Sequence, residues 1–340
     1  MALNQRRRDD LEQQGYTVFP GVYPPELVGR LRVAIDEKAL QRPDALASYE
    51  ANPYQGIFPL SNIGPIGGRI DPAVPELLAW HGARAALNSC GIADPRFSSG
   101  FSISKPPGAP ALYWHRDWHY WDSPESERKL GIQMFLMLYL VDTSPANGCL
   151  RVIPGSHTKR IPLDMEHPGG HSNWGEDLET DAALPETVAK AVADQPGAVD
   201  VDVKAGDLII GDSRMYHAAR ANGSDARRTC LTMWYVDWGS CGSGLRQAYG
   251  ARGPHGGEPC GIPVSTAEEV AMLAPLHMAY DPASDGQGEE VVSSRAMGGW
   301  GRTEGGNSRS ITTEDTFYFS QAYAQAKENV AAAAAAKARL

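Results

Sequence analysis

Residues 113–118 read Tyr-Trp-His-Arg-Asp-Trp, and a second histidine, His217, follows about a hundred residues later. Side chains two positions apart in an extended strand point to the same face, so His115 and Asp117 can offer an imidazole and a carboxylate to one point. His217, from a distant strand, would complete the set. Two histidines and one carboxylate leave one side of a divalent metal open, as catalytic non-haem Fe(II) sites require. The pattern predicts that His115, Asp117 and His217 form a catalytic metal centre.

On both sides of this motif, the residue pattern is typical of short β-strands. Gly- and Pro-rich turns separate the strands, which favours a closed or double-sheet all-β core. The segment 130–141 is apolar almost throughout, as is typical of a strand that is buried on both faces. The expected strands are 101–105, 130–141, 150–153, 198–203, 207–210 and 227–238.

Other parts of the chain are expected to surround this core. A first strand at 15–22 precedes a helix that begins at Pro24 and Pro25, with an apolar stripe at helical spacing. A second helix is expected at 75–88, and a polar insertion at 163–196 contains a short helix. We therefore predict one catalytic domain, 1–340. Its parts are a core at about 95–238, helices packed outside it from 1–94, and a lid with a terminal helix in 239–340.

Composition excludes several classes of function. The net charge of −10 disfavours a nucleic-acid partner, and no apolar run approaches membrane-spanning length. The five cysteines lack CxxC spacing and their count is odd, so we expect reduced thiols and a cytoplasmic protein. A weaker alternative is the peroxisome, because Ala338-Arg339-Leu340 resembles a peroxisomal address. The first residues show no secretory signal.

Arg228 adds a second chemical signal. It begins an expected strand, and a long cation that is directed into a core needs an anionic partner. A dicarboxylate co-substrate would provide that partner through a bidentate pair with the guanidinium.

With these residues in view, the chain resembles the phytanoyl-CoA dioxygenase family of Fe(II)/2-oxoglutarate oxygenases. The resemblance covers about 9–238. The most specific element is Pro154-Gly155-Ser156-His157 followed by Gly206-Asp207 and then His217. The segments that carry the resemblance are 12–21, 105–108, 115–118, 147–157, 204–208 and 217–222, followed by Ser224 and Arg228.

The resemblance implies a mainly β fold with flanking helices around a double-stranded β-helix, the jelly-roll or cupin-like core. It also implies that His115, Asp117 and His217 hold Fe(II), that O2 is the oxidant, and that Arg228 binds the distal carboxylate of 2-oxoglutarate. Arg227 is the competing candidate, but strand alternation would send it to the other face. Since Asp117 is present, there is no vacancy for a halide, and hydroxylation is favoured over chlorination.

Further side chains are candidates for contacts around this centre. Gln133, on the long central strand, is a candidate contact of the co-substrate, and His119 is either an outer contact or a surface residue. His157 is expected to have a structural role in a turn. Lys105 and Arg151 hint at an anionic substrate. The aromatic residues that either wall a substrate pocket or fill the core are Trp118, Tyr120, Trp121 and Trp174.

The leading hypothesis is an Fe(II)/2-oxoglutarate dioxygenase that acts on a small organic molecule, preferably a specialised metabolite. The alternative substrates within the same family are an acyl-CoA and an amino-acid-derived compound. A rival class is a metal-dependent cupin-type isomerase or hydrolase, which has no need of Arg228. A third reading is a binding module with degenerate metal ligands. The sequence leaves the substrate and the oligomeric state open.

Overall fold

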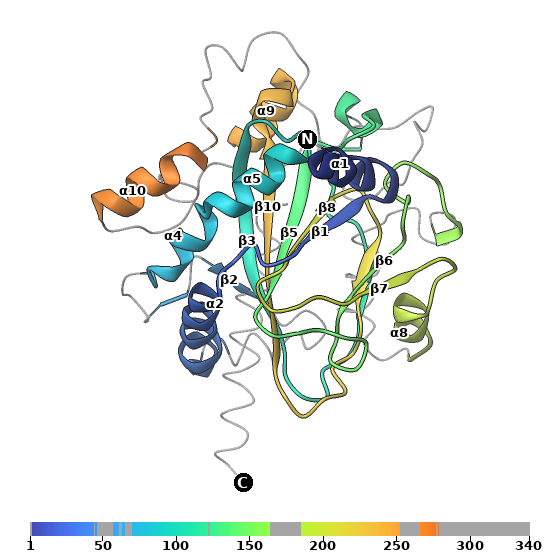
Figure 1. Ribbon diagram of the computed structural model, residues 1–340. Coiled ribbons are helices and arrows are strands. Elements are labelled where there is room, and N and C mark those ends of the chain that lie inside the picture. Colours follow the sequence, from blue (N-terminus) through green and yellow to red (C-terminus); the bar gives the residue numbers. More distant parts are fainter. Residues whose placement is uncertain are drawn as a thin grey trace.

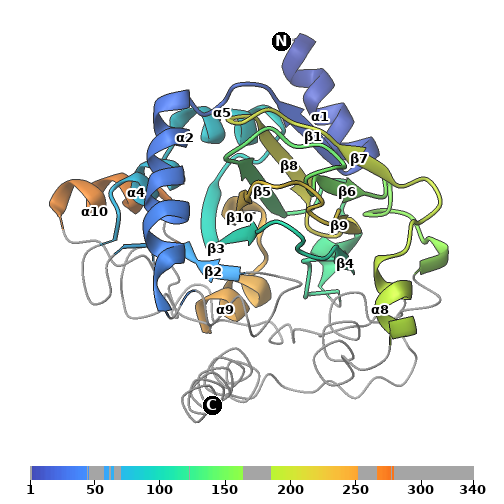
Figure 2. The same cartoon turned by 90° about the horizontal axis from the view of Figure 1, so that it is seen from below.

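The computed structural model describes residues 2–43, 45, 57–60, 63–64, 70–121, 123–163, 185–251, 266–276 and 278. Within them, two antiparallel sheets form the body of the molecule (Figures 1 and 2). The larger sheet has the order β1-β8-β5-β10-β3-β2 and the smaller has the order β4-β9-β6-β7. The strands are β1 (Tyr16–Phe19), β2 (Ile57–Pro59), β3 (Pro95–Lys105), β4 (Leu112–His115), β5 (Gln133–Tyr139), β6 (Leu150–Val152), β7 (Val199–Val201), β8 (Leu208–Asp212), β9 (His217–Ala219) and β10 (Arg228–Asp237). This architecture confirms the predicted mainly β fold with a double-stranded β-helix core.

Helices cover the outer face of the larger sheet, where α2 and α4 lie (Figure 2). The helix α2 starts with proline in its first turn, as the sequence predicted, and continues directly into the π-helical segment. The helical segments are α1 (Ala2–Gln14), α2 (Pro25–Arg32), a π-helical segment (Val33–Lys38), α4 (Ala73–Leu78), α5 (His81–Ser89), α8 (Pro185–Val192), α9 (Ser243–Ala251) and α10 (Ala267–Leu273). Short 3-10 turns occupy Ala39–Gln41, Pro124–Glu127, Trp238–Ser240 and Ala274–Leu276.

The single helix predicted at 75–88 is two helices, α4 and α5. Trp80 separates them because its backbone, with φ −56° and ψ 118°, is not helical. Its indole N–H donates to the carbonyl of Val22 at 2.7 Å, which anchors the break to the loop before α2. Apolar spacing continues across the break, so periodicity alone does not reveal it.

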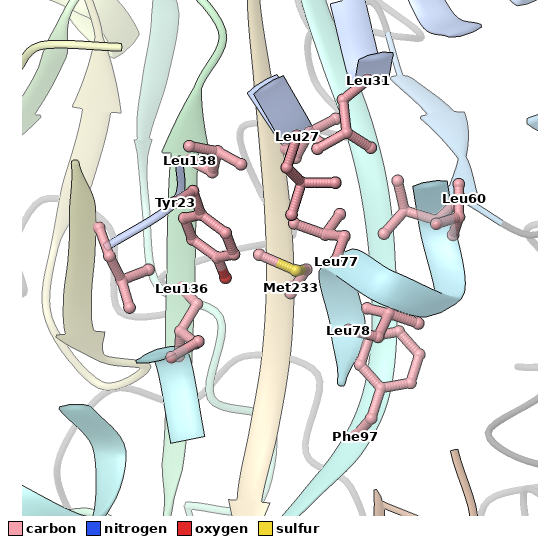
Figure 3. Packing of buried hydrophobic residues seen from close by; sticks show 14 of the residues in the cluster. Tyr23, Leu27, Leu31, Leu60, Leu77, Leu78, Phe97, Leu136, Leu138 and Met233 are labelled. Carbon is pink, nitrogen blue, oxygen red and sulfur yellow. The ribbon is translucent and has the colours of Figure 1, made fainter. Parts of the chain in front are cut away.

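The main hydrophobic core lies between these helices and the outer face of the larger sheet (Figure 3). Alternate residues of β5 and β10 point into it, such as Leu136, Leu138 and Met233, and they meet Leu27 and Leu77 from α2 and α4. The opposite face of the same strands forms a second core against the smaller sheet, with Phe135, Met137, Tyr139 and Cys230. The strand β5 is therefore buried on both faces, as its composition predicted.

Some parts of the chain differ from the expected layout or lie beyond the described residues. Two strands from before residue 95, β1 and β2, join the larger sheet, so this sheet is not confined to 95–238. Helices α9 and α10 lie in the predicted lid, where few periodic signals were found. Most of the polar insertion, 164–184, and the predicted terminal helix, 313–340, lie outside the described residues. Among the helices that are described, none has the length and apolar character needed to cross a bilayer.

Candidate metal centre

The three predicted ligands meet at one edge of the smaller sheet. His115 is the last residue of β4, and its Cα is paired with that of His217, the first residue of β9. Asp117 lies two residues beyond the end of β4 rather than in the strand, contrary to the strand-face argument. Its backbone N–H donates to the carbonyl of Ser213 at 2.9 Å, which holds the turn against the loop before β9.

The ligand atoms of this trio are close enough to share one ion. Nε2 of His115 is 3.6 Å from Oδ1 of Asp117, and Nε2 of His217 is 3.4 Å from Oδ2. All three ligand atoms lie within 4.8 Å of one another, and all three residues are buried. Two imidazoles and one carboxylate on one side of a metal form the donor set of non-haem Fe(II) oxygenases. The side chains present therefore fit Fe(II).

Backbone carbonyls fix the orientation of both imidazoles. Nδ1 of His115 is 2.9 Å from the carbonyl of Tyr113, and Nδ1 of His217 is 3.2 Å from that of Met215. Each Nδ1 must carry the proton to donate to a carbonyl, so Nε2 is left with a free lone pair. Burial, together with the charge of His217, lowers the pKa of His115 to about 4, against opposing contributions from Asp117 and the Tyr113 carbonyl. His115 is thus neutral at pH 7, as a metal ligand must be.

A glycine on β8 makes room for the ring behind His217. The ring of Phe135 lies 4.7 Å from that of His217, and Phe135 is paired with Gly211 across β5 and β8. A Cβ on Gly211 would lie 2.0 Å from the Phe135 ring. The glycine is required there so that Phe135 can pack behind the histidine.

The carboxylate of Asp117 and its backbone are both held by side chains from the larger sheet. The indole N–H of Trp234, on β10, donates to Oδ2 of Asp117 at 2.8 Å. The amide of Gln133, on β5, donates to the carbonyl of Asp117 at 3.3 Å and to the hydroxyl of Ser213 at 3.1 Å. Tyr249, from α9, donates its hydroxyl to Oε1 of Gln133 at 2.6 Å. The predicted co-substrate contact Gln133 therefore lies next to Asp117, and α9 is tied to the centre.

Two buried cations lie further along the same interior face of the larger sheet. Arg228 begins β10 and is paired with Lys105 at the end of β3, and both side chains are 2% exposed. Lys105 donates to the carbonyl of Pro110, Arg228 lies over the ring of Tyr139, and Nε of Arg228 has no hydrogen-bond partner. No carboxylate of the described residues lies within ion-pair distance of either cation. Burial, reinforced by the charge of Arg228, lowers the pKa of Lys105 to about 7.

The space between these cations and the metal ligands contains another unsatisfied group. Thr232 lies between Arg228 and Trp234 on the inward face of β10, is 1% exposed, and its hydroxyl has no hydrogen-bond partner. Arg227, the competing arginine, donates to the hydroxyl of Ser104 at 3.0 Å. Ser104 alternates with Lys105 on β3, so Arg227 points toward the helices and away from the interior.

Of the aromatic residues that were expected either to line a substrate pocket or to fill the core, two pack in the core. Trp118 and Tyr120 are buried in a cluster with α9, where Trp118 donates to the hydroxyl of Ser126 at 2.8 Å and the Tyr120 ring lies 5.2 Å from that of Tyr249. His119 and Trp121 are half-buried, and Trp174 lies outside the described residues.

Two further candidates from the sequence have structural partners. Arg151 is buried and forms ion pairs with Asp194 and Asp200, so its charge is already neutralised by the fold. His157 is fully buried, with Nε2 3.2 Å from the carbonyl of Glu12, as suits the structural role expected of it.

Sequence reasoning missed Trp234, Thr232 and Tyr249. Strand alternation could have found the first two, because positions 230, 232 and 234 share a face with Arg228 once the strand is assigned. Tyr249 carried no signal, since it lies in a segment in which no helix was predicted.

Comparison with known proteins places these features in a family. Residues 11–230 match the family described as Phytanoyl-CoA dioxygenase (PhyH). The ectoine dioxygenase of Bordetella parapertussis is 26% identical over 246 residues, which cover 69% of this chain and 75% of that protein. A probable alpha-ketoglutarate-dependent hypophosphite dioxygenase of Stutzerimonas stutzeri is 25% identical over 139 residues, covering 39% of this chain and 42% of that protein.

Solved structures with a similar fold include two enzymes. The non-heme alpha ketoglutarate dependent epimerase SnoN from nogalamycin biosynthesis superposes with a TM-score of 0.48 and 18% identity, over 69% of this chain and 83% of that one. EctD from S. alaskensis with 2-oxoglutarate and 5-hydroxyectoine gives a TM-score of 0.47 and 18% identity, over 68% and 75% of the two chains.

Proposed function

Because the chain belongs to the phytanoyl-CoA dioxygenase family, we propose that this Fe(II)- and 2-oxoglutarate-dependent dioxygenase oxidises a small organic molecule of specialised metabolism, by hydroxylation or a related change. The family match confirms the resemblance identified from the sequence motifs. It also supplies the enzyme class and the co-substrates, 2-oxoglutarate and O2.

We assign the metal to His115, Asp117 and His217, and the distal carboxylate of 2-oxoglutarate to Arg228 with Lys105. The observation that carries this assignment is the pairing of a three-ligand centre with two buried cations that have no carboxylate partner among the described residues. A buried cation without a counter-ion costs several kcal/mol, about 3–5 kcal/mol where a partner is removed from a buried pair. A dicarboxylate that reaches from the metal to these cations would supply the missing charge.

When bound, Fe(II) and 2-oxoglutarate supply the two-electron oxidation of a substrate C–H bond by O2, with 2-oxoglutarate converted to succinate and CO2. The chain's part is to bind and to orient. His115 and His217 present Nε2 because their Nδ1 protons are held by backbone carbonyls. The carboxylate of Asp117 occupies the position that a halide would need, so the proposal is an oxidation that does not add halogen.

The decisive experiment is an anaerobic titration of the protein with Fe(II) and 2-oxoglutarate, followed by the weak visible charge-transfer band of the chelate. We expect the band in the wild-type protein and its loss in His217→Ala. The matched control is His81→Ala, a histidine at the start of α5 and remote from the centre. The proposed function would be contradicted if the wild-type protein bound Fe(II) but developed no charge-transfer band with 2-oxoglutarate.

The primary substrate is then sought by succinate release. Ectoine and hypophosphite, the compounds named in the relatives, serve as first probes together with an acyl-CoA and a panel of specialised metabolites. Release that depends on one probe and is abolished in His217→Ala would identify the substrate class.

The rival cupin-type isomerase or hydrolase has no use for the two cations. It would be favoured if Arg228→Met left turnover of an identified substrate unchanged and no 2-oxoglutarate were consumed. The cytoplasmic location expected from the sequence stays a prediction, and the peroxisomal alternative rests on residues 338–340, outside the described residues.

A further inference from the structure

The hydrogen bond from Trp234 to Asp117 joins the two sheets at the metal centre. Trp234 lies on β10 of the larger sheet, whereas Asp117 follows β4 of the smaller one. The N···O distance of 2.8 Å is in the range of bonds to charged acceptors. Indole nitrogen is a donor only, so the carboxylate oxygen is the acceptor in this contact.

Two local features aim the indole at Asp117. The pairing of β10 with β3 shifts register between Trp234 and Tyr235, while the pairing of β10 with β5 on its other side stays regular. Such bulges often turn a side chain toward a functional site. The ring of Phe101, from β3, meets the indole edge to face at 5.7 Å and limits its rotation.

The bond changes what the carboxylate can offer to a metal. Oδ2 of Asp117 accepts the indole proton and lies 3.4 Å from Nε2 of His217, while Oδ1 lies 3.6 Å from Nε2 of His115. A carboxylate without such a bond rotates more freely about the bond to its Cβ. The hydrogen bond from Trp234 therefore restrains the orientation in which the carboxylate faces the two imidazoles.

We propose that Trp234 is a positioning residue that fixes the orientation in which the carboxylate of Asp117 faces the metal position beside His115 and His217. This inference rests on the proposed function for its purpose, but its physical content is metal binding. Partners that orient a metal ligand typically contribute about 10–100-fold to metal affinity. Trp234 acts through Asp117.

The test measures anaerobic binding of Co(II), a redox-stable substitute for Fe(II), to wild-type protein and Trp234→Phe. Phenylalanine keeps an aromatic ring against Phe101 but has no N–H. We expect the Co(II) dissociation constant to rise at least tenfold in Trp234→Phe, with an altered visible Co(II) spectrum. The matched control is Trp80→Phe, which removes an indole bond of 2.7 Å to the Val22 carbonyl outside the centre and should leave Co(II) affinity unchanged.

A second variant separates the hydrogen bond from packing. Replacing Trp234 with its sulfur isostere, benzothienylalanine, keeps the size of the side chain and removes only the donor. We expect the same loss of Co(II) affinity as in Trp234→Phe. An isostere with wild-type affinity, or a Trp234→Phe value within twofold of wild type, would overturn the inference.

Failure of the inference can be told apart from failure of the proposed function. If wild-type protein forms the 2-oxoglutarate charge-transfer band and Trp234→Phe binds Co(II) like wild type, only the role of Trp234 is refuted. If Trp234→Phe weakens Co(II) binding but wild-type protein forms no band, the role of Trp234 stands and the oxygenase proposal falls.

Discussion

The affinity for 2-oxoglutarate is expected to depend on pH through Lys105. Burial and the neighbouring Arg228 lower the pKa of Lys105 to about 7, so the side chain loses its charge in the free protein just above neutrality. Among the described residues, Arg228 is the charged group whose electrostatic repulsion lowers the pKa of Lys105. A bound carboxylate favours the ammonium form, so binding takes up a proton.

The size of the effect follows from these values. With a pKa of about 7 in the free protein, Lys105 is about three-quarters protonated at pH 6.5 and about 3% protonated at pH 8.5. If the carboxylate restores the ordinary pKa of about 10.4, the 2-oxoglutarate affinity falls about 25-fold across this range. The affinity is full below pH 6 and declines as pH rises through 7.

The assay is the anaerobic titration of Fe(II)-loaded protein with 2-oxoglutarate at several pH values. Lys105→Met should bind the co-substrate more weakly at pH 6.5 and lose the pH dependence. Lys204→Met, which removes an exposed lysine paired with Asp142, is the control and should behave as wild type. A wild-type affinity that is flat between pH 6.5 and 8.5, or a slope that persists in Lys105→Met, would refute the reasoning.

The same lowered pKa predicts a stability profile for the free protein. Between pH 7 and about 10 the unfolded chain holds a proton on Lys105 that the folded chain has lost, so stability rises with pH, by up to about 1.4 kcal/mol per unit. Arg228→Met should weaken 2-oxoglutarate binding at least 100-fold without changing Co(II) affinity, whereas Arg227→Met should change neither, in the same titrations. Asp212→Asn should cost about 3–5 kcal/mol in urea unfolding, because Asp212 is the buried partner of Arg214 at 2.6 Å.

Much of the strand pattern could be predicted because it depends on local composition. The long apolar segment became β5, and the turns rich in glycine and proline separate the strands that were expected. Two histidines and an aspartate at suitable spacing predicted the candidate metal centre, although Asp117 reaches it from a loop. The i, i+2 argument selected residues that the structure does bring together, but the strand ends at His115.

What could not be predicted depends on contacts between distant segments. The strands β1 and β2 are short, and only pairing with β8 and β3 makes them part of the sheet. The sequence singled out Lys105 only as a hint of an anionic substrate and did not pair it with Arg228. The pKa of Lys105 is near neutrality because the side chain is buried and, in addition, because β3 and β10 place it opposite Arg228.

The strand β10 aligns both ends of the proposed site. Arg228 and Trp234 are six residues apart, about 20 Å along an extended strand, and point to the same face. A register shift of one residue would turn both toward the helices. Pairing with β5 and β3 on either side prevents this shift, as does the burial of Leu231 and Met233 in the helix-facing core. Substitutions of Leu231 or Met233 should therefore disturb the candidate metal centre by shifting the register of β10, without any direct contact with a metal ligand.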